Sequence, residues 1–346
     1  VSTGLTLTVD TVAPNAATIT SVTDGVSPIT GALTNGAYTN DTSPVVKVSL
    51  SGTNAVSGNT IQLYNGSGTT SQLGSSYTLT STDITNGYAN VQPGTLSNGS
   101  TYTITARITD AAGNQSAVST NSTTLTVDTV APNAPGALAD AAIVSGYVNA
   151  ANDLAGQALT GTAEANSTVS VYNNGTLLGT TTANGSGAWS YTLGALAQGS
   201  YSLTAKSTDA AGNVGAASTA LAFTVDTSAP NAPTGLADAA KNAAGYVNSA
   251  IQTVTGSAEA NSTVTIYDTN GTTVVGTGVA NGSGAFSITL SSLVDGAHTL
   301  TAKSTDAAGN VSTVSTGLTL TVDTVAPNAA TITSVTDGVS PITGAL

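Results

Sequence analysis

The side chains that could do chemistry in this chain are mainly carboxylates, and half of the eighteen Asp and Glu residues stand in three short strings that recur. V-D-T-x-A-P-N-A occurs four times, T-D-A-A-G-N three times and A-E-A-N-S-T-V twice. Carboxylates are hard oxygen ligands of the kind that Ca²⁺ prefers. The acidic residues of the three strings are, in that order, Asp10, Asp128, Asp226 and Asp323; Asp110, Asp209 and Asp306; and Glu164 and Glu259.

The composition excludes several other kinds of site. The 346 residues include no Cys, one His and only five Lys and Arg, and the net charge is −13. A disulfide framework, a thiolate zinc site and a thiol nucleophile are therefore excluded, and nucleic-acid binding is disfavoured because it needs clustered cations. No apolar run of about 18 residues is present, so we expect no membrane span. No signal peptide opens at residue 1, and we expect the chain to be a slice of a longer protein.

The recurring strings also define the organisation of the chain. Residues 1–33 recur without change at 314–346, an offset of 313 residues. We therefore predict one complete 313-residue super-repeat built from three domains of sandwich size. The predicted parts are the final strand of a preceding repeat at 1–10, domains at 11–128, 129–226 and 227–323, and the start of the next repeat at 324–346.

Within a domain the apolar residues alternate with polar ones, which is typical of strands with one buried face. In the second domain Trp189, Tyr191 and Leu193 follow this pattern, and we expect Trp189 in the core. Seven short strands with frequent turns favour an all-β, immunoglobulin-like sandwich. Because the linkers are short, three sandwiches in tandem are expected to form an extended rod on the order of 120 Å long. The strands predicted in the second domain begin after Pro135 and continue at 158–163, 167–172, 176–182, 188–193, 200–208 and 217–226.

The combination of A-E-A-N-S-T-V, G-A-W-S-Y, K-S-T-D-A-A-G-N and V-D-T-x-A-P-N-A-P resembles the bacterial Ig-like repeats of giant surface adhesins. These include biofilm-associated proteins exported by type I secretion. The second and third domains match throughout, whereas the first is longer and lacks A-E-A-N-S. The resemblance implies an extracellular rod on the bacterial cell surface, with calcium bound between neighbouring domains.

The topology of a sandwich predicts which carboxylates meet. The second–third and sixth–seventh strand turns lie where the chain enters a domain, and the last strand ends where the chain leaves. We therefore expect calcium sites at the two junctions between domains, with Asn133, Asn213, Asn231 or Asn310 completing the shells. The alternative is that Asp and Asn at turns only cap nearby amides. The candidate ligands are Asp128, Glu164 and Asp209, with Asp24 and Asp41, at the first junction; Asp226, Glu259 and Asp306, with Asp140 and Asp153, at the second; and, in addition, Asp10 and Asp110.

His298 stands eight residues before Asp306, where the other two domains have Tyr102 and Tyr201. This position resembles the tyrosine corner of sandwich domains, so we expect a structural role for His298. No G-x-S-x-G nucleophile elbow accompanies it. The sequence therefore predicts no catalytic residues, no organic cofactor and no enzyme activity.

These observations favour a non-enzymatic, calcium-rigidified spacer in a large bacterial adhesin that serves cell adhesion and biofilm formation. Its expected partners are the neighbouring repeats of the same chain, and host or surface ligands bound through other regions. Two alternatives remain. One is an adhesive module that itself binds a glycan or a protein, although aromatic residues make up only 4% of the chain. The other is a self-assembling extracellular filament subunit joined by strand addition.

Overall fold

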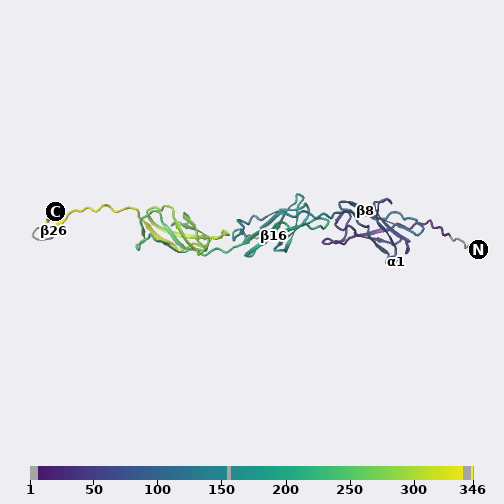
Figure 1. The fold of residues 1–346 in the computed structure, drawn as a ribbon, viewed down its shortest axis with the longest axis horizontal. Helices are drawn as coiled ribbons and strands as arrows, with labels where there is room; N and C mark the ends of the chain where they lie inside the picture. Colours follow the sequence, from purple (N-terminus) through teal and green to yellow (C-terminus); the bar gives the residue numbers. More distant parts are fainter. Residues whose placement is uncertain (1–6, 154–156, 338–343, 346) are drawn as a thin grey trace, which may run out of the picture. The chain divides into compact units, whose positions relative to one another are not determined.

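The computed structural model describes residues 7–153, 157–337 and 344–345 and divides the chain into two compact units (Figure 1). The strands of the middle repeat are distributed over both units. Apart from one short helix, every regular element among the described residues is a β-strand, so the chain is all-β. Unit one comprises Val1–Ala141, Ala155–Gly194 and Tyr201–Ala222, and unit two comprises Ala142–Leu154, Ala195–Ser200 and Phe223–Leu346.

The first repeat, in unit one, is a sandwich of two sheets. Its four-stranded sheet has the order β2 (Gly31–Ala32), β1 (Thr18–Asp24), β4 (Val45–Ser49) and β7 (Tyr88–Val91). Its five-stranded sheet has the order β3 (Ala37–Thr39), β9 (Thr123–Val127), β8 (Thr101–Thr109), β5 (Thr60–Asn65) and β6 (Gln72–Thr78).

Alternation along the strands of the first repeat creates its core. Val46 and Val48 of β4 are fully buried, and they join Ile61 and Leu63 of the other sheet in one apolar cluster. The repeat also contains the helix α1 (Ser81–Asn86), which the other repeats lack among their described residues. A capping box formed by Thr80 and Asp83 begins this helix, and Gly87 ends it in the left-handed conformation.

The strands of the second repeat in unit one confirm the predicted pattern. One sheet has the order β10 (Gly136–Ala139), β12 (Ala158–Thr162) and β15 (Ala188–Thr192). In the other, β13 (Thr168–Asn173) pairs antiparallel with β14 (Thr176–Thr182) and with β16 (Gly199–Thr208). Trp189 is buried, as predicted, and lies against Gly161.

Unit two contains the third repeat, with a three-stranded and a five-stranded sheet. The first has the order β18 (Thr234–Asp238), β20 (Thr253–Ser257) and β23 (Ala285–Thr289). The second has the order β19 (Tyr246–Val247), β25 (Leu318–Val322), β24 (Gly296–Thr305), β21 (Thr263–Tyr267) and β22 (Val274–Val279).

One recurring strand was not predicted. β3, β11 (Tyr147–Val148) and β19 are short and pair in parallel with the last strand of their repeats, which for β11 is β17 (Leu221–Val225). The chain thus contributes to both sheets before its second long strand begins. Two or three residues give no readable alternation, so the sequence pattern could not reveal these strands.

The ends of the chain lie in two partial repeats. Residues 1–6 of the predicted strand 1–10 lie outside the described residues, and residues 7–10 form no strand. Near the other end, β26 (Thr336–Asp337) pairs with β27 (Gly344–Ala345). Within the described residues, no helix is long and apolar enough to cross a membrane.

Candidate functional site

The T-D-A-A-G-N strings form tight turns closed by their own Asp and Asn. In the second repeat, Asp209 Oδ1 accepts the backbone N–H of Asn213 at 2.9 Å, and Asp209 Oδ2 accepts the Asn213 side-chain amide at 2.8 Å. The first and third repeats make the same two bonds between Asp110 and Asn114, and between Asp306 and Asn310. In each turn the carboxylate therefore caps local amides, as the simpler interpretation of these motifs expected.

The hydrogen bonds affect the acidity of Asp110. The side-chain amide of Asn114 lowers the pKa of this carboxyl; partial desolvation opposes the shift, and backbone N–H groups of the turn add to it. Asp110 therefore stays ionised at acidity that would protonate an ordinary aspartate.

The Asn of each turn also reaches the repeat before it. Asn213 Nδ2 donates to the backbone carbonyl of Asp128 at 2.8 Å. The equivalent bonds run from Asn310 to the carbonyl of Asp226 at 2.8 Å, and from Asn114 to that of Asp10 at 3.1 Å. One amide thus ties T-D-A-A-G-N to the preceding V-D-T-x-A-P-N-A. We call this arrangement the asparagine clamp.

The linkers that follow the clamps at Asp128 and Asp226 are also held by strand residues. The carbonyl of Asn133 accepts the hydroxyl of Ser207 at 3.1 Å, and that of Asn231 accepts the hydroxyl of Ser304 at 3.0 Å. Both serines are fully buried. Asn133 and Asn231 were predicted to complete the metal shells. The backbone carbonyl oxygen of each already accepts a hydrogen bond from a serine.

Further contacts surround the two clamps between complete repeats. In unit one, the N–H of Asn40 donates to the carbonyl of Ala211 at 3.1 Å. In unit two, Asn149 Nδ2 donates to the carbonyl of Ala308 at 2.9 Å. Gly309, at φ 90°, lies in this contact, and a Cβ there would stand 3.0 Å from Asn149 Nδ2. Glycine at this position therefore allows the left-handed backbone conformation and also leaves room for the Asn149 side chain.

The linker aspartates make small turns of their own. Oδ1 accepts the N–H two residues further along at 3.0 Å in both Asp128 and Asp226, and Asp10 makes the same turn. The carboxylate of Asp128 faces this turn while its carbonyl belongs to the clamp. The structure therefore brings Asp209 and Asp128 to one junction through Asn213, and Asp306 and Asp226 to the other through Asn310.

Asp24 and Asp41 are buried beside each other in the first repeat. Asp24 accepts the Thr39 hydroxyl at 2.6 Å, and Asp41 accepts the N–H of Gly25 at 2.8 Å. Both also cap an N–H two residues ahead. In the second repeat Asp140 is buried, and Asp153 accepts the N–H of Leu196 at 3.1 Å.

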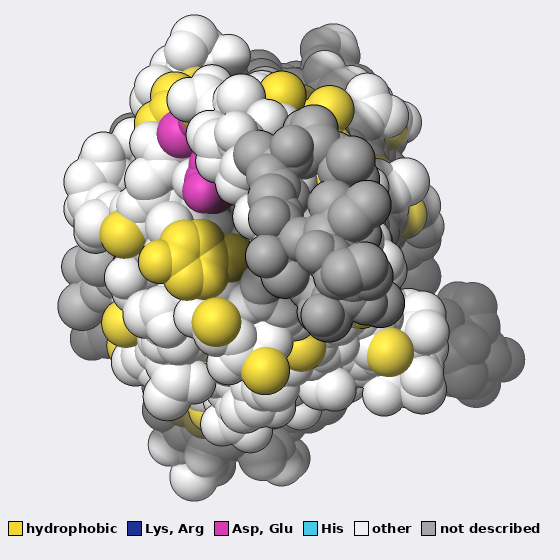
Figure 2. Space-filling model, turned by 90° about the vertical axis from the view of Figure 1, so that its left-hand side faces the viewer, with side chains coloured by type: hydrophobic (Ala, Val, Ile, Leu, Met, Phe, Trp, Pro, Cys, Tyr) yellow, Lys and Arg dark blue, Asp and Glu magenta, His cyan; other side chains and the backbone are white. Residues whose placement is uncertain are grey.

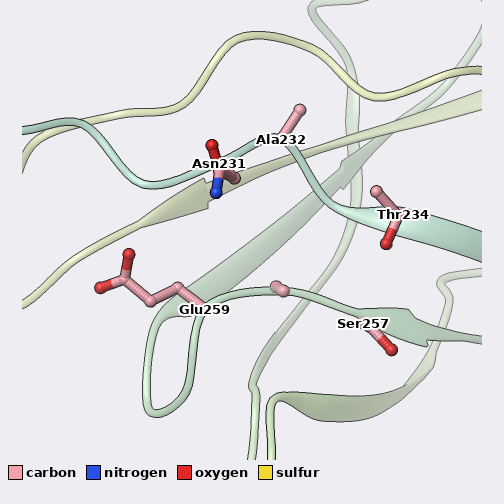
Figure 3. Close-up of a pocket in the computed structure, with 6 residues that line it drawn as sticks. Asn231, Ala232, Thr234, Ser257 and Glu259 are labelled. Atoms are coloured by element: carbon pink, nitrogen blue, oxygen red, sulfur yellow. The ribbon is translucent and has the colours of Figure 1, made fainter.

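Glu164 and Glu259 are exposed and each lines a similar cavity. Glu259 borders a cavity of about 320 Å³ together with Asn231, and Glu164 borders one of about 330 Å³ with Asn133. Figure 3 shows Glu259 projecting from the turn between β20 and β21, across from the linker segment of Asn231 and Ala232. Within the described part of the chain, neither glutamate carboxylate caps a turn in the way that Asp209 and Asp306 do.

Within the part of the chain that the structure describes, no three Asp, Glu or His side chains stand together as a metal site. Two oxygen atoms at repeat ends nevertheless suit a hard cation. Asn40 Oδ1, beside the contact with Ala211, and Asp238 Oδ2, at the end of β18, are buried without a hydrogen-bond partner among the described residues. A buried oxygen without a partner is costly unless a cation or water reaches it.

His298 has a structural position that sequence reasoning described only in part. Its Nδ1 lies 2.9 Å from Asp268 Oδ1, and its Nε2 lies 2.8 Å from the carbonyl oxygen of Val294. Burial lowers the pKa of His298, but the two hydrogen bonds and the charge of Asp268 outweigh it, so the pKa is raised above 6.5. Asp268 lies outside every recurring motif, so no sequence signal linked it to His298.

The surface carries little charge of either sign. On the face drawn in Figure 2, uncharged polar side chains and backbone predominate, and the acidic side chains in view lie together beside hydrophobic ones. The chain as a whole has 7% charged residues.

The chain is similar to two curated proteins. It is 35% identical over 207 residues to Chitinase A1 of Niallia circulans, covering 57% of this chain and 26% of that protein. It is 32% identical over 245 residues to Exoglucanase B of Cellulomonas fimi, covering 64% of this chain and 20% of that protein. The chain therefore spans about a quarter or less of the length of these relatives.

The chain is also similar to several solved structures. One is a Ca²⁺-stabilised adhesin that helps an Antarctic bacterium reach out and bind ice, with 25% identity, coverage of 91% of this chain and 75% of that chain, and a TM-score of 0.40. Another is the BSP domain of a biofilm-associated protein, with 15% identity, coverage of 91% and 67%, and a TM-score of 0.22.

Two protein-family models match adjoining parts of the chain. Residues 149–227 match a family described as a bacterial Ig-like domain, and residues 229–322 match one described as a bacterial Ig domain. Both matches fall on the strands and turns described above. Over residues 149–322 the chain therefore belongs to the bacterial Ig-like domain families.

Proposed function

We propose that the chain is a non-catalytic spacer of a large bacterial surface adhesin, in which the joints between Ig-like repeats are stiffened by hydrogen bonds and by calcium. The asparagine clamp carries this proposal. It recurs at each of the three places where V-D-T-x-A-P-N-A meets T-D-A-A-G-N, and each time a side chain of one repeat holds the backbone of the one before. Repeated joints of one design suit an extended rod better than a binding or catalytic site.

The second part of the proposal is that calcium binds at the joints. The candidate donors at the joints are all hard oxygens: Asp128 and Asp226, the exposed Glu164 and Glu259, and linker carbonyls. The partnerless oxygens of Asn40 and Asp238 support a cation near the repeat ends. Extracellular calcium sites have Kd values of about 10⁻⁴–10⁻³ M, so millimolar calcium would add about 0.4–1.4 kcal/mol per site.

The proposed location is the bacterial cell surface, outside the cell. The low charge, the absence of Cys and Met and the near-identical tandem repeats support a stalk exposed to the environment. The partners would be neighbouring repeats of the same chain, with host or surface ligands bound by other regions. A second candidate is the same spacer role within a secreted polysaccharide-degrading enzyme, which the similarity to Chitinase A1 and Exoglucanase B favours. The remainder of the open reading frame separates the two.

Small-angle scattering of the full chain with calcium and with a chelator tests the calcium joints. We expect calcium to lengthen and stiffen the particle, and Glu164→Gln and Glu259→Gln to remove that response at one joint each. These variants are cleaner than Asp209→Ala or Asp306→Ala, which also remove turn caps. Asp295→Asn, outside the proposed sites, is the control for loss of one charge. Superimposable profiles in calcium and chelator would exclude the metal and leave the clamp alone.

The clamp has its own test. Asn213→Ala and Asn310→Ala each remove one bond to the preceding repeat and one bond within the turn, so we expect greater bending at the affected joint even without calcium. Asn121→Ala, an exposed amide outside the joints, is the matched control. Unchanged scattering in both clamp variants would contradict the proposed joint.

A further inference from the structure

One side of the first repeat contains a cleft between its two sheets. In the second and third repeats, side chains pack across the corresponding seam. β6 and β7 are the edge strands of the two sheets of this sandwich. Between them lies a cavity of about 470 Å³, lined by Val45, Ser75, Ser76, Tyr77, Asn90, Val91, Gln92 and Gly94. This volume is in the range of small-molecule sites.

In the second repeat, side chains seal the corresponding seam between β14 and β15. The hydroxyl of Tyr191 donates to the carbonyl of Leu178 at 2.9 Å, and the hydroxyl of Thr181 donates to the carbonyl of Ser190 at 2.8 Å. Gly179 makes room for the tyrosine, because a Cβ there would stand 2.7 Å from its hydroxyl oxygen. These two hydrogen bonds join β14 and β15 along the seam.

The third repeat seals its seam with apolar side chains. Ile288 packs against Gly276 and Gly278, where a Cβ would stand 2.9 Å and 2.7 Å from the isoleucine. In the first repeat, the sheets instead touch at Gly74 and Pro93, where a Cβ on the glycine would stand 2.7 Å from the proline carbonyl carbon. Beyond that contact the seam opens into the cavity.

The polar side chains of the cleft are uncharged, and they can both donate hydrogen bonds to the hydroxyl groups of a ligand and accept hydrogen bonds from them. They are the amides of Asn90 and Gln92 and the hydroxyls of Ser75 and Ser76. Tyr77 adds an aromatic ring that is half-buried and held through its hydroxyl by Asp83 at 3.0 Å. None of the lining residues is charged.

We propose that this cleft binds a neutral saccharide. Neighbouring hydroxyls of a sugar match the amides of Asn90 and Gln92, and the C–H face of a pyranose ring matches the ring of Tyr77. An anion would find no cation in the lining of a chain with a net charge of −13. The nearby Lys47 lies instead over the ring of Tyr88, 3.8 Å from its centroid.

An extended peptide fits the cleft less well. Strand addition needs a continuous free edge. The pairing of β6 with β5 is irregular between Ile61 and Leu63, and the contact of Gly74 with Pro93 blocks one end of the seam. A saccharide needs neither a continuous edge nor an open end.

The test is a titration of the full chain with neutral oligosaccharides of glucose, N-acetylglucosamine, xylose, mannose and galactose, followed by calorimetry and NMR. We expect saturable binding of at least one of them, with affinity unchanged over a roughly tenfold range of NaCl because no ion pair forms. A polygalacturonate fragment and a Ser/Thr/Val hexapeptide provide the anionic and peptide arms. No saturable binding by any neutral probe, or preferred binding of the anion or the peptide, would overturn the proposal.

Variants localise the binding. Asn90→Ala and Gln92→Ala should each weaken it about tenfold, because each removes hydrogen bonds to the sugar. Ser76→Trp fills the cleft from an exposed position, so it should abolish binding without unfolding the repeat. Asn121→Ala, an exposed amide of the same repeat outside the cleft, should leave the affinity unchanged. Binding that persists in Ser76→Trp would overturn the assignment of the cleft.

Discussion

In the first repeat Val48 on β4 stands opposite Ala89 on β7, whereas at the equivalent position of the third repeat Gly256 on β20 stands opposite Phe286 on β23. All three side chains are buried. A Cβ on Gly256 would stand 2.6 Å from Phe286 Cζ, so the glycine is what allows the ring to lie there. Two related sandwiches therefore fill the same layer either with a valine and an alanine or with a phenylalanine opposite a glycine.

The two repeats differ in the same way at the corner before their longest strand. In the first repeat the Tyr102 hydroxyl accepts the N–H of Ser97 at 2.9 Å. In the third, His298 occupies the corner and bonds Val294 and Asp268 instead. A hydrogen bond from a backbone N–H to a tyrosine hydroxyl in one repeat is thus replaced by a histidine–aspartate pair in the other. The comparison shows that the fold requires a close-packed core layer and a side-chain hydrogen bond at this corner, but different residues can supply them.

The largest expected effect is the loss of the Phe286 ring. Phe286→Ala should lower the free energy of unfolding of the third repeat by about 3–5 kcal/mol, because the cavity beside Gly256 cannot be refilled by a neighbour. Val48→Ala in the first repeat should cost about 2 kcal/mol, because it removes fewer buried atoms. Hydrogen exchange of the full chain, resolved by repeat, measures both. Equal losses in the two repeats would contradict the proposed difference in packing.

Gly256→Val tests whether the two packing solutions can be exchanged. Alone, it should destabilise the third repeat by about 1–3 kcal/mol, because the added methyl groups meet the Phe286 ring and the Thr234 carbonyl. Combined with Phe286→Ala, which recreates the Val48–Ala89 pair of the first repeat, it should cost less than the sum of the single changes. A double-mutant cycle on unfolding free energies measures this coupling. Additive effects would show that the two positions do not share one space.

The corner of the third repeat should respond to pH. Because the folded-state pKa of His298 is raised, its stabilisation is complete below about pH 6.5 and is lost as pH rises through the folded pKa. Partial burial raises the pKa of Asp268, but hydrogen bonds from Thr269 and His298 lower it overall. The contribution of Asp268 is therefore present above about pH 3.9 and is lost as pH falls below that value.

Raising the pH from about 6 to about 9 should therefore lower the stability of the third repeat by roughly 1 kcal/mol. The first repeat, which has no histidine at this corner, should not show this change. Melting curves and repeat-resolved exchange recorded against pH measure the difference. His298→Tyr should remove the pH dependence of the third repeat, and its persistence in that variant would assign it to another group.

The smallest expected effect concerns a contact that belongs to the first repeat. Lys47 Nζ lies 3.8 Å from the centroid of the Tyr88 ring. Lys47→Met keeps the aliphatic stem but removes the charge, so it should cost about 0.5–1 kcal/mol in the first repeat and nothing in the third. A double-mutant cycle with Tyr88→Leu, which removes the ring, isolates the cation–π contact. In the Tyr88→Leu background, Lys47→Met should cause no further loss of stability, because the contact is already absent.

Sequence patterns predicted most of the second repeat. Strands expected at 158–163, 176–182 and 188–193 appear as Ala158–Thr162, Thr176–Thr182 and Ala188–Thr192, because alternation and turn residues are local signals. The clamp was not predicted. Its Asn recurs in every T-D-A-A-G-N, which marked it as important, but which backbone atom it meets depends on the approach of two segments 85 residues apart. The pairing of His298 with Asp268 escaped prediction for the same reason.

The repeated segment separates what the sequence by itself determines from what tertiary structure decides. Thr23 and Asp24 pair with Ala32 and Gly31, and their copies Thr336 and Asp337 pair with Ala345 and Gly344 in the same register. This short hairpin is identical in two different surroundings. The same two residue pairs form in both copies, which indicates that this pairing is a property of the local sequence.

The rest of the same segment behaves differently in its two copies. Residues 18–24 form a seven-residue strand paired with β4, and Ile19 is 4% exposed, whereas its copy Ile332 lies outside any strand and is 81% exposed. In the same way Leu7 is 79% exposed but its copy Leu320, in β25, is 3% exposed. The amino-acid pattern determined which face could be buried. Only the presence of a partner strand and an opposing sheet decided that it was, because burial of apolar surface, the main driving force of folding, requires something to bury it against.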